Sequence, residues 1–412
     1  MPTVIPAKER MTRTVQPRIT IWETVDDIDM DTWESIRDED DLFMDVRLLR
    51  VVELSMSTQA RFRYVLFSDE NGNATAITCL CTYIVDGTLL VNESWLRNLL
   101  GFLGRIVPAV VYYKVLFCGM PFSAGQSHLR FADHADRPAI LQSLCQLMDD
   151  VAKTDRARII VLKEFTDSEV TQLSAVEQHG YRRADSLPLN LVHPQQSDFE
   201  SYLAAQKSDK RWDIRRSLKR MQKAGVHVQN TSDPVEIERH FTPEVHDLYR
   251  AVFEKAETKL EFLPREFFLE IPRQLPQNCN FTFLLEGDNV RGFCATVFSR
   301  DSYYPLFVGM DYERNSQCHL YFNLLYAALA DGLSRDVKTI SMSQGTDSVK
   351  HSKLGCYHTR LSFFIKGVRL PIRLAFRLMF DKLFPEHPLM GQPDSETGGE
   401  QTIDAAKAVD HP

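Results

Sequence analysis

The chain has 412 residues, 44% of them hydrophobic and 25% charged, which indicates a globular protein of two or three domains. Its formal net charge of −8 excludes a basic field over the whole molecule, so any nucleic acid must bind at a local patch. The eight cysteines show no CxxC pair and no zinc-ligand spacing, so we expect no metal and a reducing compartment. P-loop, GxSxG, HExxH and dinucleotide glycine motifs are also missing, which argues against kinases, hydrolases and dehydrogenases.

Neither a secretory leader nor a long apolar run is visible in the sequence. The first 18 residues lack an apolar core, and no run of 18 apolar residues is free of charge. We therefore expect a cytoplasmic protein, at most peripheral to the inner membrane.

Hydrophobic periodicity predicts the same order of elements twice along the chain. The first copy comprises a strand at 18–22, helices, a hairpin at 64–82, a strand at 115–123 containing Gly119-Met120, a helix at 140–151, a strand at 158–165, and a short helix that ends at Gly180 before a last strand. The second comprises a strand at 225–230, helices, a hairpin at 281–299, a strand at 305–313 containing Gly309-Met310, a helix at 320–329, a strand at 338–345, and a short helix that ends at Gly355 before a last strand. Matching landmarks in matching order predict an internal duplication.

This strand order resembles that of the Gcn5-related N-acetyltransferase (GNAT) fold. The stretches 202–228 and 345–356, together with WESIRDEDDLFMDVRLLRVVELS, make the chain similar to Fem-type peptidyltransferases and BioF2-like acetyltransferase-domain proteins. The resemblance covers about residues 20–366 and implies an α/β fold of mixed sheets in two tandem GNAT-like units. It implies a fold more specifically than it implies a substrate.

The expected domain organisation follows from the duplication and from local composition. It is a flexible N-terminus at 1–17, a first unit at 18–195 with an apolar helical insertion near 86–111, a second unit at 196–366 with a basic helix at 207–223, a basic amphipathic segment at 367–390, and a disordered tail at 391–412. The insertion and the segment 367–390 each suit packing on the protein body or contact with lipid, and the insertion also suits contact with an acyl chain.

In the GNAT fold, chemistry takes place where two neighbouring strands splay apart. The resemblance places this point between the strands that end near Gly309 and Ser343 in the second unit. It also implies that a cofactor pyrophosphate would bind at the start of the following helix. The usual glycine-containing loop is missing there, because the second copy reads DYERNSQCHL and the first reads PFSAGQSHLR. Acyl-CoA and aminoacyl-tRNA therefore both stay open as donors.

Several polar residues near these strand ends are candidates for the site. In the second unit, Asp311 is a candidate base, with Glu313 as the alternative. Tyr312 is a candidate acid, with Tyr303 and Tyr304 as alternatives, and Gln344 is expected at the substrate. By resemblance, Lys350 and Lys353 would neutralise an acceptor phosphate or a developing oxyanion. For each of these residues a solvated surface role is the alternative.

The first unit carries its own polar candidates for substrate binding. They lie at a strand end and in the loop AGQSHLR, and they are Gln126, His128, Lys163 and Glu164. Simple exposure, or a structural role for the histidine, is the alternative reading.

The basic helix predicted at 207–223 is the strongest charge feature. Arg211, Arg215 and Arg216 are expected to bind the phosphate of CoA, a tRNA acceptor stem or a lipid headgroup, unless the helix is merely a solvated amphipathic one. Nucleic-acid binding without catalysis is disfavoured, because we expect no base-stacking aromatic beside this helix.

The function expected from these features is N-acyl or aminoacyl transfer to an amine by direct attack, since no cysteine or serine lies in an activated context. The acceptor would be a small-molecule, lipid or peptidoglycan-precursor amine. The alternative is a non-catalytic membrane- or envelope-associated binding module that has kept a degenerate GNAT fold.

Overall fold

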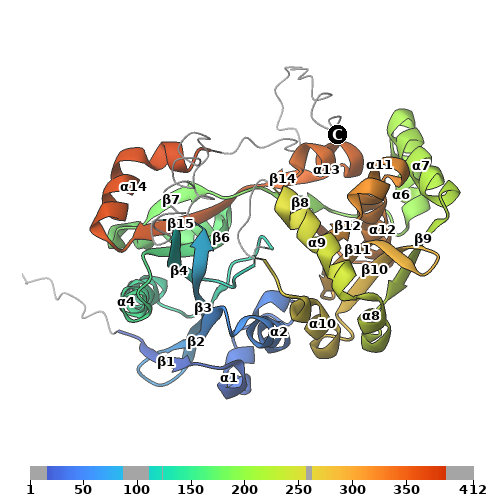
Figure 1. Ribbon diagram of the computed structural model, residues 1–412. Helices are drawn as coiled ribbons and strands as arrows, with labels where there is room; N and C mark the ends of the chain where they lie inside the picture. Colours follow the sequence, from blue (N-terminus) through green and yellow to red (C-terminus); the bar gives the residue numbers. More distant parts are fainter. Residues whose placement is uncertain (1–15, 87–110, 123, 257–261, 387–412) are drawn as a thin grey trace, which may run out of the picture.

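The computed structural model describes residues 16–86, 111–122, 124–256 and 262–386, which form two mixed sheets flanked by helices (Figure 1). The first half contains β1 (Arg18–Trp22), α1 (Met30–Glu34), α2 (Val46–Met56), β2 (Ala60–Ser68), β3 (Ala74–Asp86), β4 (Tyr112–Cys118), β5 (Leu129–Phe131), α4 (Arg137–Asp155), β6 (Ile159–Thr166), α5 (Asp167–Gln172), β7 (Arg182–Asp185) and β8 (Leu189–Val192). The second half contains α6 (Phe199–Ala205), α7 (Ser208–Lys223), β9 (Val226–Thr231), α8 (Pro234–His240), α9 (Pro243–Lys255), α10 (Arg265–Gln274), β10 (Cys279–Glu286), β11 (Asn289–Phe298), β12 (Ser302–Met310), α11 (Tyr312–Cys318), α12 (Leu320–Ser334), β13 (Thr339–Gln344), α13 (Asp347–Leu354), β14 (Tyr357–Thr359), β15 (Leu361–Gly367) and α14 (Leu370–Leu383).

The duplication predicted from the sequence is confirmed by the two sheets. Each begins with antiparallel strands, including the predicted hairpins β2–β3 and β10–β11. Gly72 and Gly287 turn these hairpins with positive φ angles of 89° and 60°. Each sheet then adds one parallel pair, β4 with β6 and β12 with β13, which is joined by the amphipathic helix α4 or α12. The expectation of a mixed α/β fold in two GNAT-like units therefore holds.

The two halves exchange a strand, which the sequence analysis did not predict. Strand β8 of the first half pairs with β13 and β14, whereas β15 of the second half pairs with β6 and β7. Each sheet is thus completed by the other half of the chain. Alternating hydrophobicity identifies a strand but not the sheet that it joins, so the sequence pattern could not reveal this crossing.

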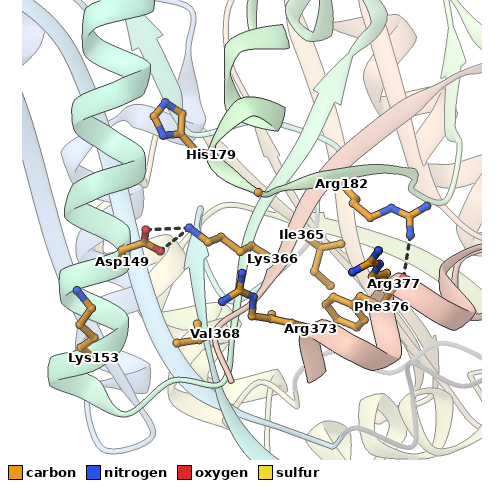
Figure 2. A pocket seen from close by; sticks show the side chains of 12 residues that line it. Asp149, Lys153, His179, Arg182, Ile365, Lys366, Val368, Arg373, Phe376 and Arg377 are labelled. Carbon is orange, nitrogen blue, oxygen red and sulfur yellow. Dashed lines mark hydrogen bonds and ion pairs between the residues drawn. The ribbon is translucent and has the colours of Figure 1, made fainter. Parts of the chain in front are cut away.

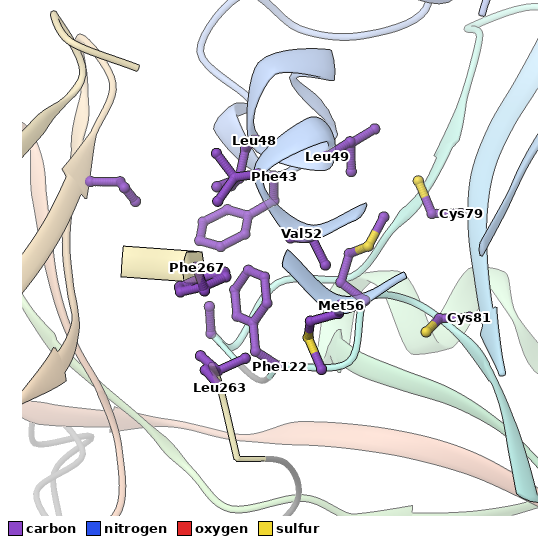
Figure 3. Packing of buried hydrophobic residues seen from close by; sticks show 14 of the residues in the cluster. Phe43, Leu48, Leu49, Val52, Met56, Cys79, Cys81, Phe122, Leu263 and Phe267 are labelled. Carbon is purple, nitrogen blue, oxygen red and sulfur yellow. The ribbon is translucent and has the colours of Figure 1, made fainter. Parts of the chain in front are cut away.

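An aromatic core joins the two halves (Figure 3). Phe43 lies beside Tyr304 with ring centroids 4.9 Å apart, and Phe122 lies 5.7 Å from Phe267. All four side chains are buried. Truncating one such phenylalanine to alanine typically costs about 3–5 kcal/mol. The halves are therefore held together by strand exchange and by a shared core.

Several further expectations can be compared with the structure. All eight cysteines are free and buried. Within the part of the chain that the structure describes, no helix is both long enough and apolar enough to cross a bilayer. The predicted tail at 391–412, nearly all of the N-terminal segment 1–17 and nearly all of the insertion near 86–111 lie outside the described residues.

Candidate active site at the splayed strands of the second half

Strands β12 and β13 separate soon after they begin. They pair only at Ser302 with Thr339 and at Tyr303 with Ile340. Past this point, the hydroxyl of Ser343 reaches across and donates to the carbonyl of Pro305 at 2.7 Å. Residues 306–308 of β12 are half-buried although the strand is central in its sheet. The gap therefore leaves main-chain groups of β12 without a ladder partner on the side of β13, as the predicted site requires.

Lys350 lies at the end of this gap with its ammonium group buried. Its Nζ donates to the carbonyl of Gln344 at 3.0 Å and approaches that of Ser343 at 3.5 Å. Burial lowers the pKa of Lys350 to about 8, and the nearby Asp347 partly opposes this shift. A lysine with this pKa exchanges its proton near neutral pH, so it suits acid–base work or the stabilisation of an oxyanion.

The exchanged strand β8 supplies a site residue that the sequence analysis missed. Asn190 is fully buried, and its amide donates to the carbonyl of Ser343 at 3.0 Å and to Asp347 at 2.7 Å. The amide of Gln344 donates in turn to the carbonyl of Leu187, just before β8, at 2.7 Å. The first half therefore fixes the end of β13 and the start of α13. An asparagine inside the apolar run LPLNLV was the available signal.

Asp311 and Tyr312 are occupied by local structural contacts. The carboxylate of Asp311 caps α11 by accepting from the main-chain N–H groups of Glu313 and Arg314, and it pairs with Arg291 at 3.2 Å. The ring of Tyr312 lies under the ammonium of Lys255 at 3.6 Å. The geometry therefore gives Asp311 a capping role, and its action as a base stays a prediction.

The two predicted lysines of α13 have different neighbours. Whereas Lys350 points to the end of β13, Lys353 forms an ion pair with Asp213 of α7. Lys353 also lies 5.5 Å from the ring of Phe322. It thus ties the basic helix to α13, and only Lys350 lies at the splayed strands.

The segment that replaces the phosphate loop is folded as helix α11. This helix leads into α12 through His319, which has a positive φ of 54°. The side chain of Asn315 accepts from the main-chain N–H of Tyr321 at 2.9 Å, so the first turn of α12 is already partly capped. The start of α12 consequently offers a poor site for a pyrophosphate.

The equivalent helix of the first half is no better suited to an anion. Helix α4 is capped by Asp136, whose carboxylate accepts from the main-chain N–H of Ala139 at 3.2 Å. A fixed negative charge at this helix start opposes a phosphate. In both halves, therefore, a side chain of the protein already engages one main-chain N–H at the helix start to which the GNAT resemblance assigns the CoA pyrophosphate.

Basic helix α7 packs across the start of α12. Burial and the neighbouring Arg220 lower the pKa of His319, and the ring accepts a hydrogen bond from Arg220 at 2.8 Å. On its other side the ring contacts the hydroxyl of Ser217 at 3.3 Å. Positive charge on α7 thus lies where the fold would otherwise place a phosphate loop.

The outer surface of α7 is a shallow cationic groove with an exposed aromatic ring. The helix carries seven cations against two carboxylates. Trp212 is 61% exposed, and the guanidinium of Arg216 lies 5.1 Å from its ring. The expectation that no stacking aromatic lies beside this helix is therefore wrong. The groove is lined by Trp212, Arg215, Arg216, Lys219, Arg220 and Lys223.

The other two predicted arginines of α7 differ in how they are engaged. Arg211 donates to the main-chain carbonyl of Ala204 at 3.0 Å, so it connects α7 to α6. Arg215 is largely exposed and lies 3.9 Å from Glu200, which leaves it available to a ligand.

Of the four candidates of the first half, Lys163 and His128 lie together beside Gly119, in a closed cleft at the ends of β4 and β6. Strands β4 and β6 stay paired up to Cys118 and Leu162. Beyond them, a Cβ at Gly119 would lie 3.2 Å from the Lys163 side chain and 3.6 Å from His128 Nδ1. The ammonium of Lys163 donates to the carbonyl of Phe122 at 2.7 Å. This cleft is therefore filled by its own side chains.

Glu164 and His128 are buried, whereas Gln126 is half-buried. Glu164 has a positive φ of 66°, and burial lowers the pKa of His128 well below its ordinary value. Neither the carboxylate of Glu164 nor the ring of His128 has a hydrogen-bond partner among the described residues.

Solved structures share this architecture. FemX has a TM-score of 0.51 at 11% identity, covering 88% of this chain and 99% of its own. A tandem GNAT protein from the clavulanic acid biosynthesis pathway also has a TM-score of 0.51, at 9% identity, covering 85% of this chain and 99% of its own. The chain therefore has the tandem GNAT fold.

A match in sequence shows the family to which the chain belongs. Residues 24–345 match the FemAB-like family, which is described as peptidoglycan biosynthesis/recognition, and the chain belongs to that family. It is also 24% identical over 244 residues to a Mycobacterium tuberculosis protein provisionally named 8-amino-7-oxononanoate synthase 2. The match covers 58% of this chain but only 31% of that relative, so the relative's named activity does not carry over.

Proposed function

We propose that the chain transfers an aminoacyl group from aminoacyl-tRNA to an amine acceptor at the gap between β12 and β13. The observation that carries this proposal is the pair of features at the start of α12. The first turn is partly capped by Asn315, and α7, whose outer surface carries the cationic groove and the exposed Trp212, packs across it. A phosphate backbone with stackable bases suits such a groove better than the compact pyrophosphate of CoA does.

The proposed reaction is a direct substitution at the ester carbonyl. The neutral acceptor amine attacks, a C–N bond forms, and the C–O bond to the tRNA ribose breaks. The amine loses one proton and the departing ribose oxygen gains one. Lys350 is the only described ammonium hydrogen-bonded to the end of β13, so we assign it the support of the oxyanion or of the leaving oxygen.

The acceptor is inferred from the family. Its description names peptidoglycan, so we propose that the attacking amine belongs to a peptidoglycan precursor. Of the other candidates, Gln344 is held at the end of β13 beside the gap and would contact this acceptor.

Binding measurements test the choice of donor. Charged tRNA should bind the full chain, and the double change Arg216→Glu with Lys219→Glu should weaken it at least tenfold, because two groove cations become anions. Arg239→Glu is the matched control, since Arg239 is an exposed cation on α8. Tight CoA binding that survives the double change would contradict the proposal.

A recognition module without catalysis is the second candidate. It is favoured by the filled cleft of the first half and by the capping role of Asp311. The two candidates differ in turnover: a module would bind the precursor and leave the aminoacyl ester intact.

A further inference from the structure

Helix α14 is apolar on two opposite sides. Its inner side is anchored to the first-half sheet by Phe376 and Phe380, which are buried, and Figure 1 shows the helix beside β7 and β15. Its outer side carries Leu370, Leu374 and Leu378, one helical turn apart, with exposed fractions of 75%, 53% and 72%. Three leucines in a row on an outer helix face are unusual for a surface in water and typical of a surface that is covered.

Cations accompany this leucine row. From residue 369 to residue 382 the segment holds four cations, Arg369, Arg373, Arg377 and Lys382, against the single carboxylate of Asp381. Among the described residues, no carboxylate lies within ion-pairing distance of the three arginines. The partner of this face must therefore offer both apolar groups and negative charge.

A cationic cavity of about 430 Å³ lies directly beside α14 (Figure 2). Its charged lining comprises five cations and one carboxylate, namely Lys153, Arg182, Lys366, Arg373, Arg377 and Asp149. The carboxylate of Asp149 is already engaged, because Lys366 donates to both of its oxygens at 2.7 and 2.8 Å. Lys153 also pairs with Asp150, and Arg182 lies 3.6 Å from Asp381. The surplus positive charge of the cavity therefore comes from Arg373 and Arg377.

Arg182 connects the lining of the cavity to α14. Its guanidinium donates to the main-chain carbonyl of Phe376 at 2.8 Å and stacks on the ring of Phe380 at 3.8 Å. It therefore holds α14 in place and leaves Arg373 and Arg377 to face an incoming anion (Figure 2).

We propose that α14 binds the surface of an anionic phospholipid bilayer. The leucine row enters the acyl boundary, and the arginines with the adjacent cavity receive lipid phosphates. Two other occupants fit less well. A second copy docked by twofold symmetry would bring the same cationic faces together. The segment 387–412 of this chain is acidic but contains few large apolar residues that could cover leucines.

Vesicle flotation of the full chain tests this docking without reference to any reaction. Binding to phosphatidylcholine vesicles that contain phosphatidylglycerol should exceed binding to pure phosphatidylcholine at least tenfold. The double change Leu374→Glu with Leu378→Glu should abolish most of it. The matched control is Leu54→Glu with Val235→Glu, which places the same charges on exposed apolar positions of α2 and α8 and should bind like the wild type.

Other outcomes would overturn the proposal. Equal binding by the control and the α14 variant would show that the leucines do not bind the bilayer. Failure of the wild type to bind anionic vesicles would refute the proposal as a whole. A dimer in light scattering that Leu374→Glu with Leu378→Glu dissociates would assign the face to a second copy. Tighter flotation of a chain ended after Glu386 would assign it to the acidic segment.

Discussion

Replacing Lys350 by methionine should remove a pH dependence from the stability of the protein. Burial lowers the pKa of Lys350 from 10.5 to about 8, so the unfolded state binds more protons than the folded state between these values. Stability due to this group therefore rises with pH through this window, and the penalty for burying the charge is fully present below pH 8. Between pH 7 and pH 9.5 the gain amounts to about 2 kcal/mol.

Urea unfolding at a series of pH values measures this difference. The free energy of unfolding of the wild type should rise by about 2 kcal/mol relative to Lys350→Met between pH 7 and pH 9.5. Lys353→Met is the control on the same helix, because that side chain is 30% exposed and paired with Asp213. A constant difference between the wild type and Lys350→Met over this range would refute the buried ammonium at the end of β13.

Two further changes test the packing around the gap between β12 and β13, and a third tests the cationic groove of α7. Asn190→Leu removes two buried hydrogen bonds from the exchanged strand, so it should lower the free energy of unfolding by roughly 1–3 kcal/mol. It should also speed amide hydrogen exchange in α13 while leaving β2 and β3 protected, and unchanged exchange in α13 would argue against the exchanged strand. Gly309→Ala places a Cβ 2.3 Å from the Phe293 ring, so overpacking should cost roughly 1–3 kcal/mol in urea unfolding, and an unchanged midpoint would contradict this packing. Trp212→Ala should weaken charged-tRNA binding by roughly 1–3 kcal/mol in a filter assay without lowering stability, and unaltered affinity would exclude stacking in the groove.

Much of the fold could be predicted because it depends on local periodicity. The hairpins, the strand at 18–22 and the helix stops at Gly180 and Gly355 all occur where the pattern placed them. The internal repeat made these predictions stronger, since one copy supported the other. A glycine after a helical pattern predicts the end of the helix, because the left-handed conformation there favours a residue without a side chain.

The candidate site could be located from the sequence only in part. Strands β12 and β13 separate after Tyr303 and Ile340, and Lys350 donates to the end of β13. The catalytic role of Lys350 stays a prediction. The contribution of Asn190 depends on strand exchange, which periodicity does not report. The loop after β12 folds into α11, which Asp311 caps through the main-chain N–H groups of Glu313 and Arg314. The sequence analysis interpreted Asp311 as a base, because a carboxylate after a strand suits a helix cap and a catalytic base equally well.

The most direct test of the proposed function is a transfer assay with two competing donors. The full chain is given a peptidoglycan-precursor amine, a pool of tRNA charged with labelled amino acids and labelled acetyl-CoA, and the label on the precursor is measured. Transfer from tRNA that falls at least tenfold in Arg216→Glu with Lys219→Glu is the result that the account predicts. Transfer from acetyl-CoA that persists in that variant would contradict it.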